Sequence, residues 1–304
     1  MIWLIGNRGM LGREVEALLN RQQRDHIATD MEVDITNIEQ LKEFVSDKPV
    51  SWIINCAAYT SVDKAEDEPA LAFKINADGP SNIARIAVKK NARLIHISTD
   101  YVFDGTKEGA YLETDLPNPI NIYGKSKLKG EKNIAETLKA HFIIRTAWLY
   151  GKNGNNFVRT MLKLFKEKSE VKVVDDQWSS PTYAYDLAEA VIRIIDIDPV
   201  TFGLYHFTNE GRINWHQFAT EIYNLAGIEG LIDRSVRLPP IEIGQYPTKA
   251  KRPANSYLSK EKIVRDFNIS LKLWKESLAH FISTLPLPNT NGRYSNLSKG
   301  QRDR

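Results

Sequence analysis

The sequence predicts an α/β fold, built as a doubly wound parallel sheet with a smaller lobe on its C-terminal side. Two observations predict this class. Five short apolar segments in the first half alternate with amphipathic segments of helical period. A glycine-rich turn directly follows the first apolar segment and opens the first helical one. Strands that are apolar on both faces and separated by helices are typical of a parallel sheet covered on both sides.

The expected elements follow in order along the chain. In the first half, strands are expected at 2–5, 26–29, 52–55, 93–98 and 141–145, and helices near 10–22, 37–46, 69–90 and 123–139. After Trp148 the pattern is looser, with helices expected near 155–168, 184–196, 214–226 and 271–284 and strands at 171–174 and 204–207. We therefore expect a dinucleotide-binding domain at 1–150 completed by segments near 183–208, a mainly substrate-binding lobe at 151–285, and a disordered tail at 286–304.

Composition narrows the class of protein. Of the 304 residues, 42% are hydrophobic and 26% are charged, as in ordinary soluble globular proteins. The net charge of +3 is small and its basic residues are dispersed, so no nucleic-acid partner is expected. The single cysteine, Cys56, excludes an internal disulfide and fits a reducing compartment. No signal peptide or membrane-spanning segment is recognised, so we expect a cytoplasmic protein without a membrane partner.

The first strand leads into the glycine motif Gly6-x-x-Gly9-x-x-Gly12. In a strand–turn–helix context, one glycine permits the tight turn, one lets the backbone approach a pyrophosphate, and one lets the helix lie close to the sheet. The helix N-terminus then offers free N–H groups to the phosphates. A glycine-rich turn without a ligand is the alternative interpretation, and the strand–turn–helix context favours the phosphate site.

The end of the second strand bears on the choice of cofactor. Asp30 lies about twenty residues after the glycine motif, where an acidic residue binds the adenosine ribose of NAD. Asp34 follows it and is either a second contact or the cap of the next helix. Arg8 lies inside the glycine loop, where a guanidinium favours the 2′-phosphate of NADP. The residues alone leave NADP and NAD open.

Small or polar residues follow three further strands of the predicted sheet. Ala57 and Ala58 follow the third strand, the segment 98–101 (Ser-Thr-Asp-Tyr) follows the fourth, and Trp148 follows the fifth. Each has a structural alternative, as packing, turn or core residues. Because ligands of doubly wound folds bind beyond the carboxyl ends of the strands, the three sets together indicate a site.

Tyr123 and Lys127 lie four residues apart at the start of a predicted helix, so both side chains lie on one face. Free tyrosine has a pKa of about 10, and a nearby ammonium lowers it toward neutrality. The pair can therefore transfer a proton, and the hydroxyl of Thr99 or Ser98 can bind the same substrate oxygen. An ordinary surface pair is the alternative, and the glycine loop in the same chain weakens it.

The motifs GxxGxxG, STDYVFDG and YGKSKLKGE together resemble the extended short-chain dehydrogenases/reductases, and more narrowly the dTDP-4-dehydrorhamnose reductase family. NCAAYTSVDKAEDEP, INADGP, RTAWLYG, GNNFVRTM and KRPANSYLS strengthen the resemblance, which covers about residues 1–285. It implies a Rossmann-like fold and hydride transfer from NADPH, with NADH possible, to the C4 ketone of dTDP-4-dehydro-L-rhamnose. It also implies a dTDP-sugar substrate and a monomer or homodimer.

The resemblance also implies roles for individual residues. Tyr123 matches the general acid, Lys127 the residue that holds the nicotinamide ribose and lowers the pKa of the tyrosine, and Thr99 the hydroxyl that polarises the ketone. The remaining matches are Gly9, Met10 and Leu11 for the pyrophosphate, Asp30, Asp34 and Ile35 for the adenosine end, Ala58, Tyr59 and Thr60 for the central part of the cofactor, and Asp100, Trp148, Val62 and Tyr101 for the sugar nucleotide.

The sequence departs from the family pattern at Asn7 and Arg8, where many relatives have smaller residues, which puts the cofactor preference in doubt. Some relatives bind a metal at a dimer interface. Glu14 matches one ligand at most, and no metal is predicted.

Two other functions remain open: a reductase or epimerase for another nucleotide sugar, and a non-catalytic NADP-binding subunit resembling the regulatory subunit of methionine adenosyltransferase. Intact Tyr123, Lys127 and Thr99 argue against the second.

Overall fold

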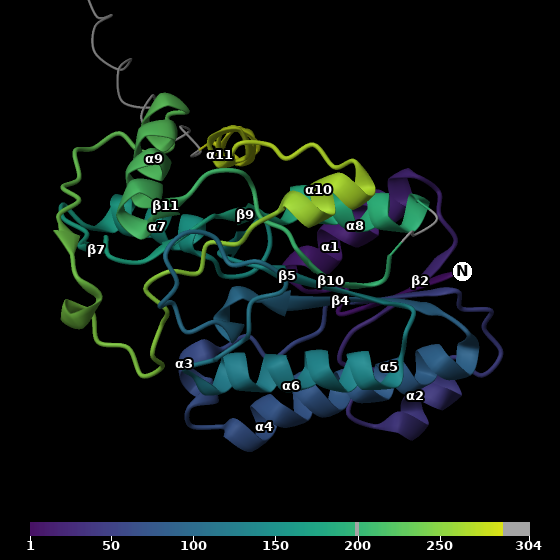
Figure 1. Ribbon diagram of the computed structural model, residues 1–304. Helices are drawn as coiled ribbons and strands as arrows, with labels where there is room; N and C mark the ends of the chain where they lie inside the picture. The colour runs from purple at the N-terminus through teal and green to yellow at the C-terminus, as the bar shows by residue number, and fades with distance from the viewer. Residues whose placement is uncertain (198–200, 288–304) are drawn as a thin grey trace, which may run out of the picture.

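The computed structural model describes residues 1–197 and 201–287, and its centre is a six-stranded parallel sheet (Figure 1). The strands lie in the order β10-β5-β4-β3-β1-β2. Their bounds are β1 Ile2–Ile5, β2 His26–Thr29, β3 Trp52–Asn55, β4 Arg93–Thr99, β5 His141–Thr146 and β10 Gly203–His206. The chain adds strands on both sides of β1, so the order reverses between β1 and β3. The predicted doubly wound α/β fold is confirmed.

Helices cover both faces of the sheet (Figure 1). On one face lie α2 (Ile38–Phe44), α4 (Pro69–Phe73), α5 (Gly79–Lys90) and α6 (Ile122–Thr137), and on the other lie α1 (Met10–Arg21), α8 (Ala184–Asp196) and α10 (Glu261–Phe267). The strands are mainly apolar because both faces of the sheet are covered. Leu4 packs into the cluster beneath α1 and α8, whereas the next residue, Ile5, packs into the cluster beneath α2 and α5.

The helix expected near 69–90 is not uniform. A π-helical turn, Lys74–Asp78, lies between α4 and α5. Such turns are rare and occur frequently at functional sites. This one carries Asn76, whose side chain is buried and contacts the segment after β3.

The second lobe packs beside the carboxyl edge of the sheet. Helices α7 (Phe157–Glu167), α9 (Trp215–Ile228) and α11 (Trp274–Ser283) enclose a core that includes Phe165, Phe218 and Phe281. Its strand pairs are two residues long: β6 (Leu149–Tyr150) with β9 (Thr182–Tyr183), β8 (Trp178–Ser179) with β11 (Ile213–Asn214), and β7 (Val173–Val174) with β12 (Pro240–Ile241).

Several shorter features differ from the expected elements. The strand expected at 171–174 is reduced to β7, while α10, the short helix α3 (Val62–Ala65) and the 3-10 turns at Asp100–Val102 and Ile243–Gln245 were not expected. The expected tail at 286–304 lies, from residue 288 onward, outside the described residues. Within the described part of the chain, no helix combines the length and apolar character needed to cross a membrane.

Candidate active site

The glycine loop forms a cradle between β1 and α1. Gly6 has a φ of +81°, and a Cβ at this position would lie 2.6 Å from the backbone nitrogen of Ala57. A Cβ on Gly12 would lie 2.0 Å from the carbonyl oxygen of Gly6. Gly9 is the N-cap residue of α1, so the first-turn N–H groups of Met10 and Leu11 point out of the helix. The cradle therefore fits a pyrophosphate group.

The loop after β2 is tied to this cradle. Asp30 accepts hydrogen bonds from the backbone N–H groups of Arg8 at 3.1 Å and Met31 at 2.9 Å. The guanidinium of Arg8 forms an exposed ion pair with Glu32 at 3.3 Å. Backbone hydrogen bonds from Asp30 and Glu32 lower the pKa of the Glu32 carboxyl, and Arg8 acts in the same direction. Acidic and basic side chains thus lie together in the loop after β2.

Asp34 and Ile35 make mainly structural contacts. Asp34 accepts hydrogen bonds from the backbone N–H and the hydroxyl of Thr36. It is not the cap of α2, as one interpretation of the sequence held, because Asn37 accepts the N–H groups of that helix. The side chain of Ile35 is buried so tightly that a Cβ on Gly79 would lie 2.6 Å from its Cδ1. The side chain of Ile35 thus packs against α5.

The segment after β3 is held from two sides. Asn76 in the π-helical turn accepts the N–H of Tyr59 at 2.8 Å and donates to the carbonyl of Tyr59 at 3.0 Å and to Ser126 at 3.0 Å. Ala58 and Tyr59 are half-buried and Thr60 is exposed. The backbone from Ala58 to Thr60 is therefore fixed in position by a buried amide that sequence reasoning did not single out.

Thr99 and Asp100 lie at the end of β4, where the chain enters a 3-10 turn. Thr99 Oγ1 accepts the N–H of Tyr101 at 3.2 Å and donates to Asp100 at 3.0 Å. Burial raises the pKa of Asp100 to about 6, and hydrogen bonds from Ser256 and Thr99 oppose the rise. A hydroxyl and a carboxyl group are therefore fixed side by side at the carboxyl edge of the sheet.

Helix α6 brings Tyr123 to this edge. Its N-cap residue, Asn121, accepts the N–H of Gly124 at 2.7 Å. A Cβ on Gly124 would lie 2.0 Å from the carbonyl oxygen of Tyr101, so this turn of α6 packs directly on the chain after Thr99. The rings of Tyr101 and Tyr123 meet edge to face, with centroids 5.9 Å apart. The structure thus places Tyr123 beside the Thr99–Tyr101 turn.

Burial controls the acidity of Tyr123. It raises the pKa of the phenol to about 12, and a hydrogen bond with Thr99 acts in the opposite direction. The expectation that Lys127 lowers this pKa is wrong for the chain alone, because loss of hydration outweighs other influences. A raised pKa keeps the phenol protonated at neutral pH, which is the form that a general acid requires.

Lys127 lies one turn further along α6 and is 2% exposed. Its Nζ donates to the carbonyl oxygen of Ile97 at 2.7 Å and lies 3.4 Å from His96 Nε2. Burial lowers the pKa of Lys127 to about 8, and the Glu131 carboxylate opposes the change. The ammonium is therefore much closer to neutrality than an exposed lysine.

A buried ion pair lies beneath these groups. Arg145 of β5 binds the carboxylate of Glu131 in two places, Nη2 to Oε2 at 2.6 Å and Nε to Oε1 at 3.0 Å. Ser98 donates its hydroxyl to the same carboxylate. Ser98 is therefore occupied in the core, which leaves Thr99 as the hydroxyl beside Tyr123.

Two tryptophans join the lobes at the edge of the site. Trp148 has a φ of +48°, in the left-handed region that bulky residues rarely adopt. Its indole stacks on Trp215 of α9, with ring centroids 3.5 Å apart and an interplanar angle of 12°. Val62 is half-buried at the start of α3. Sequence reasoning missed Trp215, because no local pattern distinguishes it from a core aromatic.

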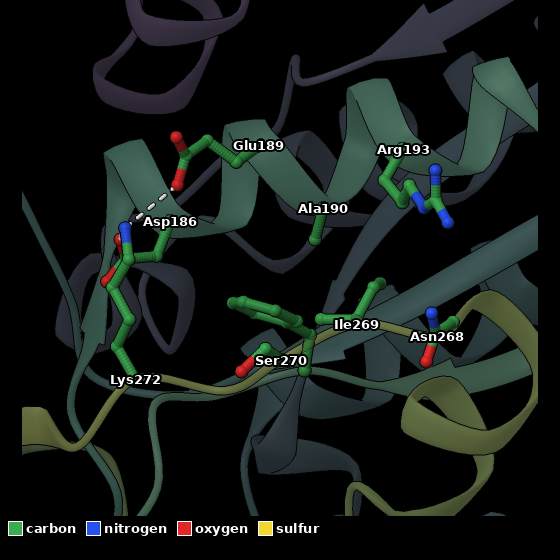
Figure 2. Close-up of a pocket in the computed structure, with 9 residues that line it drawn as sticks. Asp186, Glu189, Ala190, Arg193, Asn268, Ile269, Ser270 and Lys272 are labelled. Carbon is green, nitrogen blue, oxygen red and sulfur yellow. Dashed lines mark hydrogen bonds and ion pairs between the residues drawn. The ribbon is translucent and has the colours of Figure 1, made fainter.

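A separate cavity of about 210 Å³ lies between α8 and the segment after α10 (Figure 2). Asp186 and Glu189 of α8 face Lys272 across it, with ion-pair distances of 2.8 and 2.9 Å. Lys272 thus pairs with both carboxylates, and none of Thr99, Tyr123 and Lys127 lines the cavity. We assign it to the junction of the lobes.

Glu14 is buried on α1, and burial raises the pKa of its carboxyl, which Lys152 and Arg21 oppose. Within residues 1–197 and 201–287, no group of three or more His, Cys, Asp or Glu side chains is placed to hold a metal ion.

The glycine cradle fits the pyrophosphate of a dinucleotide, and a half-buried tyrosine and a buried lysine lie at the same edge of the sheet. Fold and site together define an NAD(P)H-dependent oxidoreductase. Residues 1–286 match the family model described as RmlD substrate binding domain. A dTDP-4-dehydrorhamnose reductase of Aggregatibacter actinomycetemcomitans is 40% identical, and the match covers 90% of this chain and 96% of the relative. The dTDP-4-dehydrorhamnose reductase of Escherichia coli K12 is 38% identical, and the match covers 93% of this chain and 97% of the relative. The chain belongs to the dTDP-4-dehydrorhamnose reductase family.

Solved structures agree with this assignment. A dTDP-4-dehydrorhamnose reductase of Clostridium acetobutylicum is 41% identical, with a TM-score of 0.87, over 92% of this chain and 98% of its own. The enzyme of Bacillus anthracis, solved in complex with NADP, is 39% identical, also with a TM-score of 0.87, over 92% and 97%. The fold of this chain is therefore that of the family over nearly its whole length.

Proposed function

We propose that this protein uses NADPH to reduce the C4 ketone of dTDP-4-dehydro-L-rhamnose, giving dTDP-L-rhamnose. The observation that carries the proposal is the half-buried Tyr123 beside Thr99, at the same edge of the sheet as the glycine cradle. The names of relatives about 40% identical support the substrate, and the NADP complex of the Bacillus anthracis enzyme supports the cofactor. NADH is the alternative reductant.

The cofactor supplies the hydride, and the chain supplies its position and the proton. Tyr123 holds a proton until the ketone oxygen gains charge, and the hydroxyl of Thr99 turns from Asp100 to donate its one hydrogen to the same oxygen. Lys127 holds the nicotinamide end. The other cofactor contacts are Gly6, Gly9, Met10, Leu11 and Gly12 at the pyrophosphate, Asp30, Asp34 and Ile35 at the adenosine, and Ala58, Tyr59 and Thr60 between them.

The sugar nucleotide lies between the two lobes in this proposal. Asp100, Tyr101, Val62 and Trp148 contact it from the cofactor side, and the lobe at 151–285 closes over it. The dinucleotide-binding part is 1–150, with 183–208 adding α8 and β10 to its layers. All these residues come from one chain, so the activity is compatible with a monomer or a homodimer, and we place the protein in the cytoplasm.

A substrate panel tests this function against its alternatives. Purified protein is mixed with NADPH and, in turn, dTDP-4-dehydro-L-rhamnose and 4-keto sugars linked to UDP, GDP or CDP, and oxidation of NADPH is followed by absorbance. Turnover of the dTDP-rhamnose precursor in clear preference to the others supports the proposal. Preference for another keto sugar would reassign the substrate. NADPH binding without any turnover would favour the regulatory subunit.

Glu32→Gln is expected to increase the preference for NADPH over NADH. The substitution removes a negative charge next to Arg8 at the adenosine end, so the guanidinium is released for a 2′-phosphate. We expect the ratio of kcat/KM values for the two cofactors to rise about threefold to fivefold, the range typical of one exposed charge. Glu39→Gln, which removes another exposed carboxylate paired with a lysine, is the control. An unchanged ratio of kcat/KM values in Glu32→Gln would show that Arg8 does not bind the 2′-phosphate of NADPH.

A further inference from the structure

A buried hydrogen-bonded chain lies behind Lys127. Asn55 ends β3 and pairs directly with His96 in the register of β3 and β4. Asn55 Nδ2 lies 2.9 Å from His96 Nδ1, and His96 Nε2 lies 3.4 Å from Lys127 Nζ. All three side chains are at most 2% exposed. Neither Asn55 nor His96 has a place in the proposed function so far.

A backbone hydrogen bond fixes which groups donate and which accept in this set of hydrogen bonds. The N–H of Ala57 donates to Asn55 Oδ1 at 3.0 Å, so the amide oxygen faces Ala57 and the amide nitrogen faces the imidazole. An amide nitrogen only donates, so His96 Nδ1 must accept and carries no proton. Burial lowers the pKa of His96 far below its usual value, so the ring is neutral. Its single proton is therefore on Nε2, which faces Lys127.

This tautomer suits one form of Lys127 better than the other. An ammonium has three donors and no lone pair, so it has nothing to accept from an imidazole N–H. An uncharged amine has a lone pair and can accept that hydrogen. The Asn55–His96 pair therefore favours the amine relative to the ammonium.

We propose that Asn55 and His96 are positioning residues for proton transfer: Asn55 fixes the tautomer of His96, whose Nε2–H stabilises the amine that Lys127 becomes when its proton passes to Tyr123. The inference rests on the proposed function. Tyr123 gives its phenolic proton to the ketone oxygen, and the O–H bond so formed replaces the one broken at the phenol. The phenolate then takes a proton from Lys127 Nζ, and Lys127 regains one from water after the product leaves.

The other groups around Lys127 leave room for this effect. From its own helix, Glu131 favours the ammonium, but its carboxylate is shared with Arg145 of β5. From the segment after β3, Cys56 lies nearby, and burial raises the pKa of this thiol to about 12, so it is uncharged. From β4, the carbonyl of Ile97 accepts one hydrogen in either form. The pKa of Lys127 is lowered overall, which agrees with surroundings that favour the amine over the ammonium.

Asn55→Asp tests the hydrogen bonds from Asn55 through His96 to Lys127, because aspartate has nearly the same shape as asparagine. One carboxylate oxygen can still accept the N–H of Ala57, while the other now accepts from His96 Nδ1. The ring proton moves to Nδ1, and Nε2 offers a lone pair to the ammonium. We expect the alkaline limb of the kcat profile to move up by about one pH unit, with little change in KM. Asn20→Asp, on the exposed side of α1, is the control for the added charge.

A double variant distinguishes an effect of the His96 tautomer from an effect of the negative charge that Asn55→Asp adds. If Asn55→Asp acts through the imidazole, the shift is lost in the Asn55→Asp/His96→Gln double variant. The same shift in both backgrounds would overturn the proposal, because the charge alone would then explain it.

A spectroscopic measurement needs neither substrate nor turnover. Histidine labelled with ¹⁵N distinguishes protonated from unprotonated ring nitrogens, and the signals of His96 are assigned by their loss in His96→Gln or, if that variant does not fold, by through-bond correlation. We expect the wild-type full chain to carry the proton on Nε2 between pH 6 and 9. A proton on Nδ1 in the wild type would overturn the inference. Loss of the proposed function would instead appear as absent turnover with this tautomer unchanged.

Discussion

Tyr123→Phe is expected to lower kcat by a factor of about 100 to 10,000, the usual contribution of a general acid. Burial holds the phenol in its protonated form, so it is ready to neutralise an oxyanion at neutral pH. Phenylalanine keeps the ring and its edge-to-face contact with Tyr101 but has no proton to give. Steady-state kinetics with the dTDP keto sugar measure the loss.

Binding measurements separate this chemical role from a structural one. NADPH affinity of Tyr123→Phe, followed by the fluorescence of the reduced nicotinamide, is expected to stay within a few-fold of the wild type, since the glycine cradle is untouched. Tyr246→Phe, at an exposed position in the second lobe, is the control and should retain full turnover. Unchanged kcat in Tyr123→Phe would remove Tyr123 from the mechanism.

Glu131→Gln is expected to lower the free energy of unfolding by about 3 to 5 kcal/mol, the cost of leaving one partner of a buried ion pair alone. Arg145 is 2% exposed and binds the carboxylate through two nitrogens. A glutamine offers one acceptor and an NH₂ group, so the guanidinium remains charged and poorly paired. Urea unfolding followed by circular dichroism measures the difference.

Glu136→Gln is the matched control, because Glu136 lies on the same helix with an exposed side chain. Exposed substitutions of this kind change stability by at most about 0.5 kcal/mol. Equal stability of the two variants would contradict the account of the Glu131–Arg145 pair.

The sheet and the glycine loop could be predicted because their signals are local. Residues such as Leu4 and Ile5 are apolar in succession, and in short segments that alternate with helical ones this pattern is typical of strands buried on both faces. The backbone of Gly6 adopts a conformation that glycine tolerates best. Tyr123 and Lys127 were found because a spacing of four on a helix places side chains on one face.

The groups behind Lys127 could not be predicted, because they depend on the register between strands far apart in the sequence. Asn55 meets His96 across β3 and β4, and Ser98 pairs with Arg145 across β4 and β5. In the sequence, His96 is one polar residue in an apolar strand, a pattern that many buried histidines share. Asn76 depends on a π-helical turn that the periodicity of 69–90 does not reveal.

The direction of the pKa shift of Tyr123 also required the structure. The sequence suggests only that a lysine is near, which predicts a lower pKa. Loss of hydration raises the pKa of Tyr123 instead, where α6 packs on the carbonyl of Tyr101.

Isotope transfer tests the central claim most directly. The protein is supplied with dTDP-4-dehydro-L-rhamnose and NADPH in which both hydrogens at the reacting carbon of the nicotinamide are deuterium, and the sugar product is examined by NMR and mass spectrometry. The account predicts one deuterium at C4 of the hexose in dTDP-L-rhamnose. A product without deuterium at C4, or cofactor and substrate left unchanged, would contradict it.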